Sequence, residues 1–335
     1  MTSAAIGPIA IEFPDRLENN AMLQKEFPKW DMAAIEQRTG IAARYIAEPE
    51  ECASDLAVRA GQRLFKEFDI DPASIDFLLL CTQTPDYPLP TTACIVQDRL
   101  NLRTTIGALD FNLGCSGFVY GLSLAQGLIH AGTVRRVLLI TAETYSKYID
   151  PADRSLRTIF GDAAAATLVD ASDEPSLSSF KFGTDGQGAD TLIVNQGGAR
   201  SADAAIQPRH RQRWPSPMYM DGPSLITYAS ETLPPLIEAV LNDAQLTRAD
   251  VNLFLFHQAT RRLLHHLRDL IGLEDERMPI EISHCGNTVS STIPILLQTL
   301  RDQGRIERGS QNMLIGFGVG LSWAGCMWTE TWQPR

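Results

Sequence analysis

The chain has 335 residues, of which 44% are hydrophobic and 21% are charged, and its formal net charge at pH 7 is -11. These values are typical of a globular protein with one large or two fused cores, and the apolar runs are too short to span a bilayer. The acidic balance argues against a general nucleic-acid binder, because no dominant positive field is present to replace the counterions of phosphate.

The N-terminal residues and the cysteines indicate the cellular compartment and the redox state of the protein. The N-terminal residues lack the basic and long apolar regions of a secretory signal, so we expect a cytoplasmic protein. The cysteines follow neither a CxxC pattern nor a His-rich metal spacing, which favours reduced thiols and predicts no metal site. They are Cys52, Cys81, Cys94, Cys115, Cys285 and Cys326.

Helices and strands alternate through the first half of the sequence. Apolar residues at helical spacing predict a helix over 55–68, and an apolar run predicts a strand over 75–81. A loop rich in proline and threonine follows, since proline cannot join a central strand, and a helix is expected over 93–100. A strand over 136–141 and a Gly-Asp turn into a short apolar element within 154–168 complete this half.

The second half repeats this order. We expect helices over 221–244, 260–270 and 292–300, and strands over 251–256, 281–283 and 312–316. The repeat predicts an internal duplication with halves 1–172 and 173–335, the first carrying a nucleophile and the second its polar partners. Alternating strands and helices also predict a layered α/β architecture with largely buried sheets.

The segment 106–132 joins a strand pattern to a helix pattern at a cysteine. We expect a buried strand over 109–113 and a helix that ends near Gly132, with Cys115 in the glycine-bounded turn between them. Unpaired N–H groups and the dipole at the helix N-terminus stabilise negative charge, so Cys115 should ionise more easily than a free cysteine. This is the setting of a nucleophile. The alternative is a small apolar residue that fills a tight turn.

Two further polar residues stand at comparable junctions. His257 follows the apolar run NLFLF, and Asn287 lies in HCGNTVSST between a glycine and small hydroxyl residues. Each of them alone is more often structural. Because the ends of equivalent strands converge in a duplicated α/β chain, Cys115, His257 and Asn287 together predict one catalytic site.

Five segments, in order and at matching spacing, carry a resemblance to a known family: LDFNLGCSGFVYGL, TIFGDAAAATLV, FHQATRRL, CGNTVSSTIP and GFGVGLSWAG. They resemble the motif series of the β-ketoacyl-acyl-carrier-protein synthase III branch of the thiolase superfamily, over nearly the whole chain. The resemblance implies a duplicated thiolase-like fold, layered αβαβα with two central mixed sheets, in a homodimer active in fatty-acid biosynthesis.

The resemblance also implies roles for individual residues. Cys115 as thiolate attacks an acyl thioester, and backbone N–H groups of Cys115 and Val319 bind the oxyanion. His257 and Asn287 then donate to the thioester oxygen of a malonyl group as it loses CO₂. No metal or redox cofactor is required, because coenzyme A thioesters and phosphopantetheine carriers are the substrates. The implied partners are acyl-CoA and acyl carrier protein, with no nucleic acid and no membrane.

Other positions match the family's substrate contacts. Arg38, Arg154 and Arg262 resemble basic residues that contact coenzyme A phosphates or the carrier, and surface ion pairing is the alternative. Leu89 matches a bulky residue at the end of the acyl pocket that often reaches across the dimer, and a plain core leucine is the alternative. Thr260 stands where the family usually has asparagine.

Two basic clusters, 209–213 and 261–268, are either landing sites for an anionic partner or solvated faces. Departures from the family pattern argue against ordinary acetyl-CoA priming. Ala34 stands where the family often has an adenine-stacking tryptophan, Trp30 is out of phase with that position, and Pro223 replaces a common asparagine. Together with Thr260, these residues favour a longer acyl group or one delivered by a carrier protein.

Three functions are therefore open to the sequence. The first is a condensing enzyme that joins an acyl and a malonyl thioester, in fatty-acid initiation or in a specialised pathway. The second is an acyltransferase of the same fold that forms an ester or amide. The third is a non-catalytic partner subunit. Asn287 favours the first, because decarboxylation benefits from two oxyanion donors.

Overall fold

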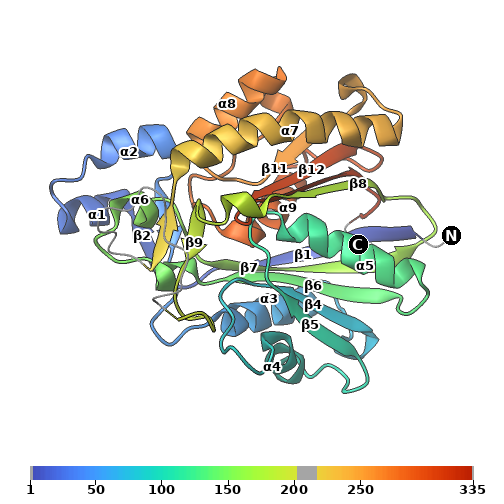
Figure 1. Cartoon of the computed structure of the whole chain (residues 1–335). Coiled ribbons are helices and arrows are strands. Elements are labelled where there is room, and N and C mark those ends of the chain that lie inside the picture. The colour runs from blue at the N-terminus through green and yellow to red at the C-terminus, as the bar shows by residue number, and fades with distance from the viewer. Residues whose placement is uncertain (1–2, 202–216, 334–335) are drawn as a thin grey trace.

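The computed structural model describes residues 3–201 and 217–333 and contains two mixed β-sheets (Figure 1). The first sheet has the strand order β1-β7-β6-β4-β5. Strand β4 is parallel to β5 and β6, whereas β7 is antiparallel to β6 and β1. The strands are β1 (Ser3–Glu12), β4 (Phe77–Cys81), β5 (Gly107–Phe111), β6 (Arg136–Glu143) and β7 (Ala163–Ser172).

The second sheet repeats the order and directions of the first. Its order is β11-β12-β13-β8, with β11 parallel to β12 and the other pairs antiparallel. Read from β8, this matches the first sheet read from β1, so the predicted duplication is confirmed at the level of topology. The strands are β8 (Leu177–Thr184), β11 (Leu253–Phe256), β12 (Gln311–Gly318) and β13 (Ser322–Thr329).

The duplication is imperfect at one edge. Residues 281–283, predicted as a strand, form no strand and leave the second sheet without a counterpart of β5. The carbonyl of Ser283 instead accepts hydrogen bonds from the N–H groups of Ala42 and Ala43. The chain crosses from one sheet to the other between β7 and β8, where the predicted boundary of the halves falls. The division into halves 1–172, with the nucleophile, and 173–335, with its polar partners, stays a prediction.

Helices lie outside and between the sheets (Figure 1). Helices α3 (Ala53–Glu67) and α4 (Thr92–Arg99) pack on the outer face of the first sheet. Helices α7 (Gly222–Ala244) and α8 (Arg261–Ile271) pack on the outer face of the second. Helices α5 (Gly117–His130) and α9 (Thr292–Asp302) lie between the sheets. The predicted αβαβα layering is confirmed.

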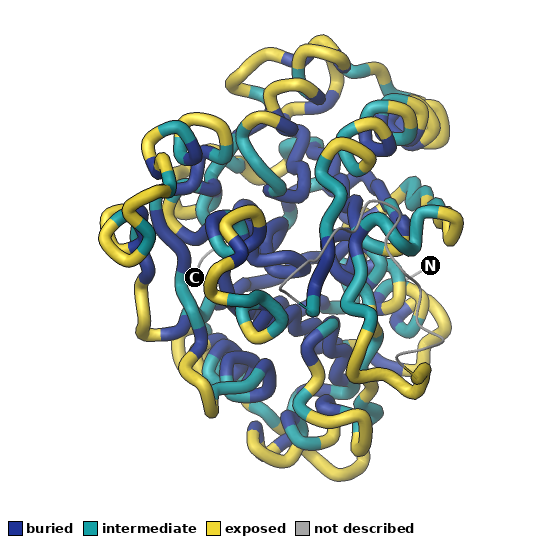
Figure 2. Tube along the Cα trace, turned by 60° about the vertical axis from the view of Figure 1, so that its left-hand side comes forward, coloured by how far each residue is buried: buried dark blue, intermediate teal, exposed yellow. Residues whose placement is uncertain are grey.

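The middle layer contributes to a buried apolar cluster, and Figure 2 shows that buried residues lie at the centre of the molecule. Phe118 and Leu122 of α5 pack with Ile293 and Leu296 of α9, and all four are fully buried. Burying each such side chain contributes roughly 1.5–3 kcal/mol. The layer therefore anchors the two helices whose N-terminal ends carry Cys115 and the segment after Asn287.

Strand β5 differs from its prediction. It begins and ends two residues earlier than expected and is not buried, since Leu109 is 39% exposed. The reason is its place at the free edge of the sheet, where only β4 pairs with it. Helix α5 follows as predicted, and Gly132 beyond its end has a φ of 70°, which favours glycine.

Smaller elements complete the described chain. They are α1 (Asn20–Glu26), α2 (Met32–Thr39), α6 (Arg154–Arg157), the pair β2 (Leu17–Asn19) and β3 (Ala43–Tyr45), and the pair β9 (Leu192–Val194) and β10 (Met218–Met220). All six cysteines are free thiols. Among the described helices, none is long and apolar enough to cross a membrane.

Candidate active site

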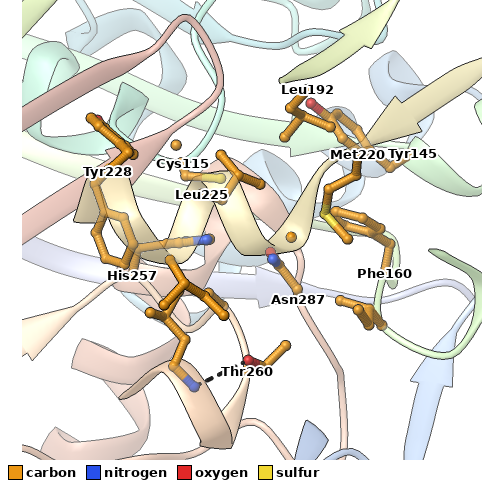
Figure 3. A pocket seen from close by; sticks show the side chains of 17 residues that line it. Cys115, Tyr145, Phe160, Leu192, Met220, Leu225, Tyr228, His257, Thr260 and Asn287 are labelled. Atoms are coloured by element: carbon orange, nitrogen blue, oxygen red, sulfur yellow. Dashed lines mark hydrogen bonds between the residues drawn. The ribbon is translucent and has the colours of Figure 1, made fainter. Parts of the chain in front are cut away.

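Three segments far apart in sequence meet at one cavity. Cys115 lies just before α5, His257 directly follows β11, and Asn287 lies in the turn that leads to α9. All three line a cavity of about 150 Å³ and are at most 6% exposed. Figure 3 shows their side chains directed toward this common space. The structure thus brings the three predicted residues together, and their catalytic roles stay predictions.

Glycines allow the backbone to close around Cys115. A Cβ added at Gly318 of β12 would lie 2.9 Å from the sulfur, and one at Gly316 would lie 2.7 Å from the Cα of Ser116. A Cβ at Gly114 would lie 2.5 Å from Oε1 of Gln83. A side chain at Gly318 would collide with the sulfur, and side chains at the other two positions would collide with Ser116 or Gln83, so these glycines let the chain close around Cys115.

The environment of Cys115 keeps its resting form a thiol. Burial raises the pKa of Cys115 to about 12, and the nearby Glu143 carboxyl adds to the rise. Hydrogen bonds from the backbone N–H groups of Cys115 and Val319 act in the opposite direction. The expectation that the helix N-terminus would make this cysteine ionise easily is therefore wrong, because burial outweighs the helix end. The two N–H groups are nevertheless those predicted to bind an oxyanion.

The hydrogen bonds of His257 fix its tautomer. Its Nδ1 lies 2.7 Å from Oγ1 of Thr292, and that hydroxyl donates to the carbonyl of Val289 at 3.1 Å. Because the hydroxyl proton is already engaged, Nδ1 must carry the hydrogen and donate it. Nε2 is then left as an acceptor. Burial lowers the pKa of His257 to about 3, so the ring is neutral and can act as a base.

Asn287 presents its donor to the cavity. Its Oδ1 accepts a hydrogen bond of 2.9 Å from the N–H of Val289, which leaves the amide nitrogen for the cavity. Its backbone N–H donates to the carbonyl of Ile159 at 2.9 Å, and its carbonyl accepts from Gly161 at 3.1 Å. The first half of the chain therefore holds a residue of the second half in place.

Val289 serves both polar residues at a strained position. Its φ of 56° lies in the left-handed region, which is unfavourable for a β-branched residue. Its N–H holds the amide of Asn287, and its carbonyl accepts from Thr292, the partner of His257. Such strain persists only where surrounding structure enforces it, and it clusters at functional sites.

Comparison with known proteins decides the family. The family model for 3-Oxoacyl-[acyl-carrier-protein (ACP)] synthase III matches residues 109–186, and the model for its C-terminal part matches residues 241–329. A relative from Streptomyces coelicolor, Beta-ketoacyl-[acyl-carrier-protein] synthase III 3, is 38% identical over 320 residues, 94% of each protein. The chain belongs to the β-ketoacyl-[acyl-carrier-protein] synthase III family.

Other synthase III proteins agree with this assignment. Beta-ketoacyl-[acyl-carrier-protein] synthase III of Clostridium tetani is 34% identical over 300 residues, 88% of each protein. A crystal structure of 3-oxoacyl-(acyl-carrier-protein) synthase III is 43% identical, with a TM-score of 0.90 over 98% of this chain and 100% of that one. The chain is accordingly a condensing enzyme of the synthase III type, with a thiolase-like fold. The alternative of a non-catalytic partner subunit receives no support.

A buried carboxyl that sequence reasoning missed lies beside the synthase III site. Glu143 ends β6 and is fully buried. It accepts hydrogen bonds from the hydroxyls of Ser290 at 2.8 Å and Thr84 at 3.1 Å, and from the N–H of Gln83 at 3.0 Å. It therefore ties the end of β4 to the loop that follows Asn287. The only signal in the sequence was one acidic residue at the end of an apolar strand.

We expect the stability contributed by Glu143 to fall as pH rises. Burial raises its pKa from 4.5 to about 8, with hydrogen bonds from Ser290, Gln83 and Thr84 opposing the rise. Between these values the folded state holds a proton that the unfolded state has lost, so the free energy of unfolding falls by up to about 1.4 kcal/mol per pH unit. Glu143→Gln lacks this slope.

Urea unfolding of wild type and Glu143→Gln at several pH values measures the slope. The variant should be less stable at low pH, because its amide nitrogen faces hydrogen-bond donors. Its deficit should shrink toward pH 8. Glu48→Gln, which removes an exposed carboxylate, is the matched control. Parallel stability curves for wild type and Glu143→Gln would contradict the buried carboxyl's role.

The predicted basic contacts lie on the surface. Arg38 is the last residue but one of α2 and Arg262 is the second residue of α8, and these helices adjoin where the side chain of Arg261 packs on Gly40. Arg154 is the first residue of α6. Arg38, Arg154 and Arg262 are all exposed, and none forms an ion pair with the described residues. The ion-pairing alternative is thus absent from the part of the chain that the structure describes.

Other predicted substrate positions fall in different places. Thr260 lines the cavity, and its hydroxyl accepts from the N–H of Leu263 at 3.4 Å to cap α8. Leu89 is 83% exposed, so the alternative of a core leucine is wrong, and it does not line the cavity of its own chain. Trp30 stacks on Phe27 with ring centroids 4.1 Å apart.

Of the two predicted basic clusters, 209–213 lies outside the described residues, and the other lies on α8. Within that second cluster, Arg268 pairs with Asp275 at 2.9 Å. Apolar residues that the sequence did not single out also line the cavity. They are Tyr145, Ile159, Phe160, Leu192, Met220, Leu225, Ile226, Tyr228 and Leu263.

Proposed function

We propose that this synthase III-type enzyme transfers an acyl group from acyl-CoA to Cys115 and then condenses it with malonyl-acyl carrier protein. The products are a 3-oxoacyl thioester, CO₂ and coenzyme A. One observation supports the proposal: two different groups of hydrogen-bond donors face the cavity. The N–H groups of Cys115 and Val319 donate to the sulfur, whereas the amide of Asn287 is held by Val289, whose carbonyl binds Thr292, the partner of His257.

In the first half-reaction His257 activates the thiol. Its unprotonated Nε2 takes the proton of Cys115, and the thiolate attacks the acyl carbonyl. The N–H groups of Cys115 and Val319 stabilise the tetrahedral oxyanion, each with an effect of roughly 10²–10³ in rate. The departing sulfur of coenzyme A takes the proton from His257, and the ring is neutral again. The acyl group is then bound to the sulfur as a thioester.

In the second half-reaction His257 takes up one proton from solvent as the negatively charged malonyl group binds, and that proton helps to stabilise an enolate. The malonyl thioester oxygen accepts hydrogen bonds from the amide of Asn287 and from protonated His257 while CO₂ departs. The negative enolate oxygen keeps the imidazolium charged despite its burial. The carbanion attacks the acyl carbonyl, the Cys115 sulfur leaves, and His257 returns its proton to the sulfur. Atoms and charges balance without a metal or redox cofactor.

Product analysis tests this function against ester or amide formation. Wild-type enzyme is mixed with an acyl-CoA and malonyl-acyl carrier protein, and the carrier is examined by intact mass. A 3-oxoacyl carrier together with an equal amount of CO₂ supports condensation. If the malonyl carrier stays unchanged and the acyl group is transferred to an added alcohol or amine, the result would contradict condensation and support the acyltransferase alternative.

The exposed arginines fit the anionic groups of these substrates, since coenzyme A and the phosphopantetheine carrier both bear phosphate. We expect Arg262→Ala to raise KM for malonyl-acyl carrier protein about twofold to fivefold, because an exposed ionic contact contributes up to ~1 kcal/mol. Steady-state kinetics should show an unchanged kcat and a weaker salt dependence. Arg135→Ala, which removes an exposed arginine after α5, is the control. An unchanged KM in Arg262→Ala would make that arginine part of a solvated face.

A homodimer is also proposed. Strand β5 leaves one edge of the first sheet unpaired, with half-exposed apolar residues such as Leu109, and Leu89 protrudes from a nearby loop. An apolar exposed edge is a template for pairing with a second copy. Across such a dimer Leu89 would reach the partner's acyl site. Sedimentation tests the dimer: we expect a dimeric wild type and a monomeric Leu109→Asp variant. A wild type that is monomeric like the variant would contradict the dimer.

A further inference from the structure

Two cavities meet at Tyr145. The first is the cavity of Cys115, and the second, of about 700 Å³, is bordered by Gln83, Asn112 and Tyr148. Only Tyr145 and Leu192 line both among the described residues. Both are buried, at 4% and 7% exposure. These two side chains therefore form the wall between the space beside the nucleophile and the larger space beyond it.

Hydrogen bonds hold the phenol of Tyr145 in this wall. It donates to Oε1 of Gln83, and Nε2 of Gln83 donates to Oδ1 of Asn112 at 3.0 Å. The hydroxyl of Tyr148 donates to the carbonyl of Gln83 at 3.3 Å, and the N–H of Gln83 donates to Glu143. Gln83 is thus fixed through both its backbone and its side chain, and the phenol has a rigid acceptor.

The two sides of the wall differ in chemistry. On the side of Cys115 the neighbours of Tyr145 are apolar, including Phe160 at a ring-centroid distance of 5.3 Å and Met220. On the far side the amides of Gln83 and Asn112 are already paired with each other. An alkyl chain that ends before the wall leaves every one of these hydrogen bonds intact. A longer chain must displace the phenol and leave a buried donor and acceptor unpaired.

From this arrangement we infer that the hydrogen bond between Tyr145 and Gln83 limits the length of the acyl group and makes short apolar acyl thioesters the starter class. The inference rests on the proposed function, because it concerns the acyl group bound to Cys115. The sequence favoured either a longer acyl group or one delivered by a carrier protein, and the inference goes against the first of these. Ala34 and Pro223, on which that expectation partly depended, line neither cavity.

A chain-length series tests the inference. Acetyl-, butyryl-, hexanoyl-, octanoyl- and decanoyl-CoA are each incubated with the enzyme, and the rate of adduct formation is followed by intact mass. In wild type the rate should fall steeply for the longer chains. In Tyr145→Ala the ratio of the decanoyl rate to the acetyl rate should rise at least about tenfold, since one buried hydrogen bond and a ring no longer block the passage.

Two further pairs of variants make the test specific. Tyr145→Phe removes only the hydroxyl and should give a smaller increase, whereas Tyr45→Phe, whose ring stacks on Phe13 and lines neither cavity, should leave the ratio unchanged. Leu192→Ala removes the second side chain of the wall and should also raise the ratio. It replaces Tyr145→Ala in the test if that variant does not fold. Ile193→Ala is its control, because Ile193 lines only the outer cavity.

The outcomes separate this inference from the proposed function. A wild-type enzyme that takes decanoyl as fast as acetyl, or an unchanged ratio in both Tyr145→Ala and Leu192→Ala, would overturn the length limit while leaving the condensing function in place. No adduct from any acyl-CoA on the wild-type enzyme would overturn the proposed function and the length limit together.

Discussion

Replacing Cys115 with alanine should abolish the acyl adduct and reduce condensation roughly 10⁴-fold or more, because the only proposed site of covalent attachment is removed. Decarboxylation of malonyl-acyl carrier protein should continue in this variant, since the donors of His257 and Asn287 remain. Intact mass after incubation with acyl-CoA measures the adduct, and labelled CO₂ release measures decarboxylation.

Cys81→Ala is the matched control for Cys115→Ala. Cys81 is a second fully buried thiol close to the site, and its sulfur donates to the carbonyl of Leu113 at 2.8 Å. It does not line the cavity, so its loss should leave the adduct unchanged. An adduct that persists in Cys115→Ala and disappears in Cys81→Ala would identify Cys81 as the nucleophile and contradict our account.

Replacing Asn287 with alanine should separate the two half-reactions. We expect CO₂ release from malonyl-acyl carrier protein to fall about 10²–10³-fold, the effect of removing one oxyanion donor. Self-acylation should change far less, because the N–H groups of Cys115 and Val319 serve that step. Single-turnover assays of adduct formation and of CO₂ release from the same protein sample compare the two directly.

Ser290→Ala controls for damage to the Asn287 loop. Ser290 lies three residues further along and binds Glu143, so its loss disturbs the same loop without removing a donor from the cavity. Both half-reactions should survive in this variant. Equal losses of acylation and decarboxylation in Asn287→Ala would instead make that residue a structural support of the loop.

The duplicated order of helices and strands let the sequence predict the meeting of Cys115, His257 and Asn287. Strand ends that correspond in two related halves must converge, so positions more than 100 residues apart could be placed together. The αβαβα layering followed from the same alternation. The missing strand at 281–283 could not be foreseen, because the carbonyl of Ser283 accepts its hydrogen bonds from Ala42 and Ala43, which are distant in sequence.

Features that depend on three-dimensional burial escaped prediction. The ionisation of Cys115 was expected from its place at a helix end, but the depth of the cavity decides it. Glu143 and Gln83 gave no pattern in the sequence, because a single polar residue at a strand end has no periodicity. Leu89 could be matched to the family but not placed, since nothing in the pattern of its loop shows that its side chain is 83% exposed.

A single-turnover chase tests the central claim most directly. Wild-type enzyme is loaded with a labelled acyl group from acyl-CoA and freed of excess donor. One portion is digested to map the label, and a second portion is mixed with malonyl-acyl carrier protein. We predict that the label maps to the peptide containing Cys115 and then moves to the carrier as a 3-oxoacyl group, with one CO₂ released per acyl group. A label on another residue, or one that malonyl carrier fails to discharge, would contradict the account.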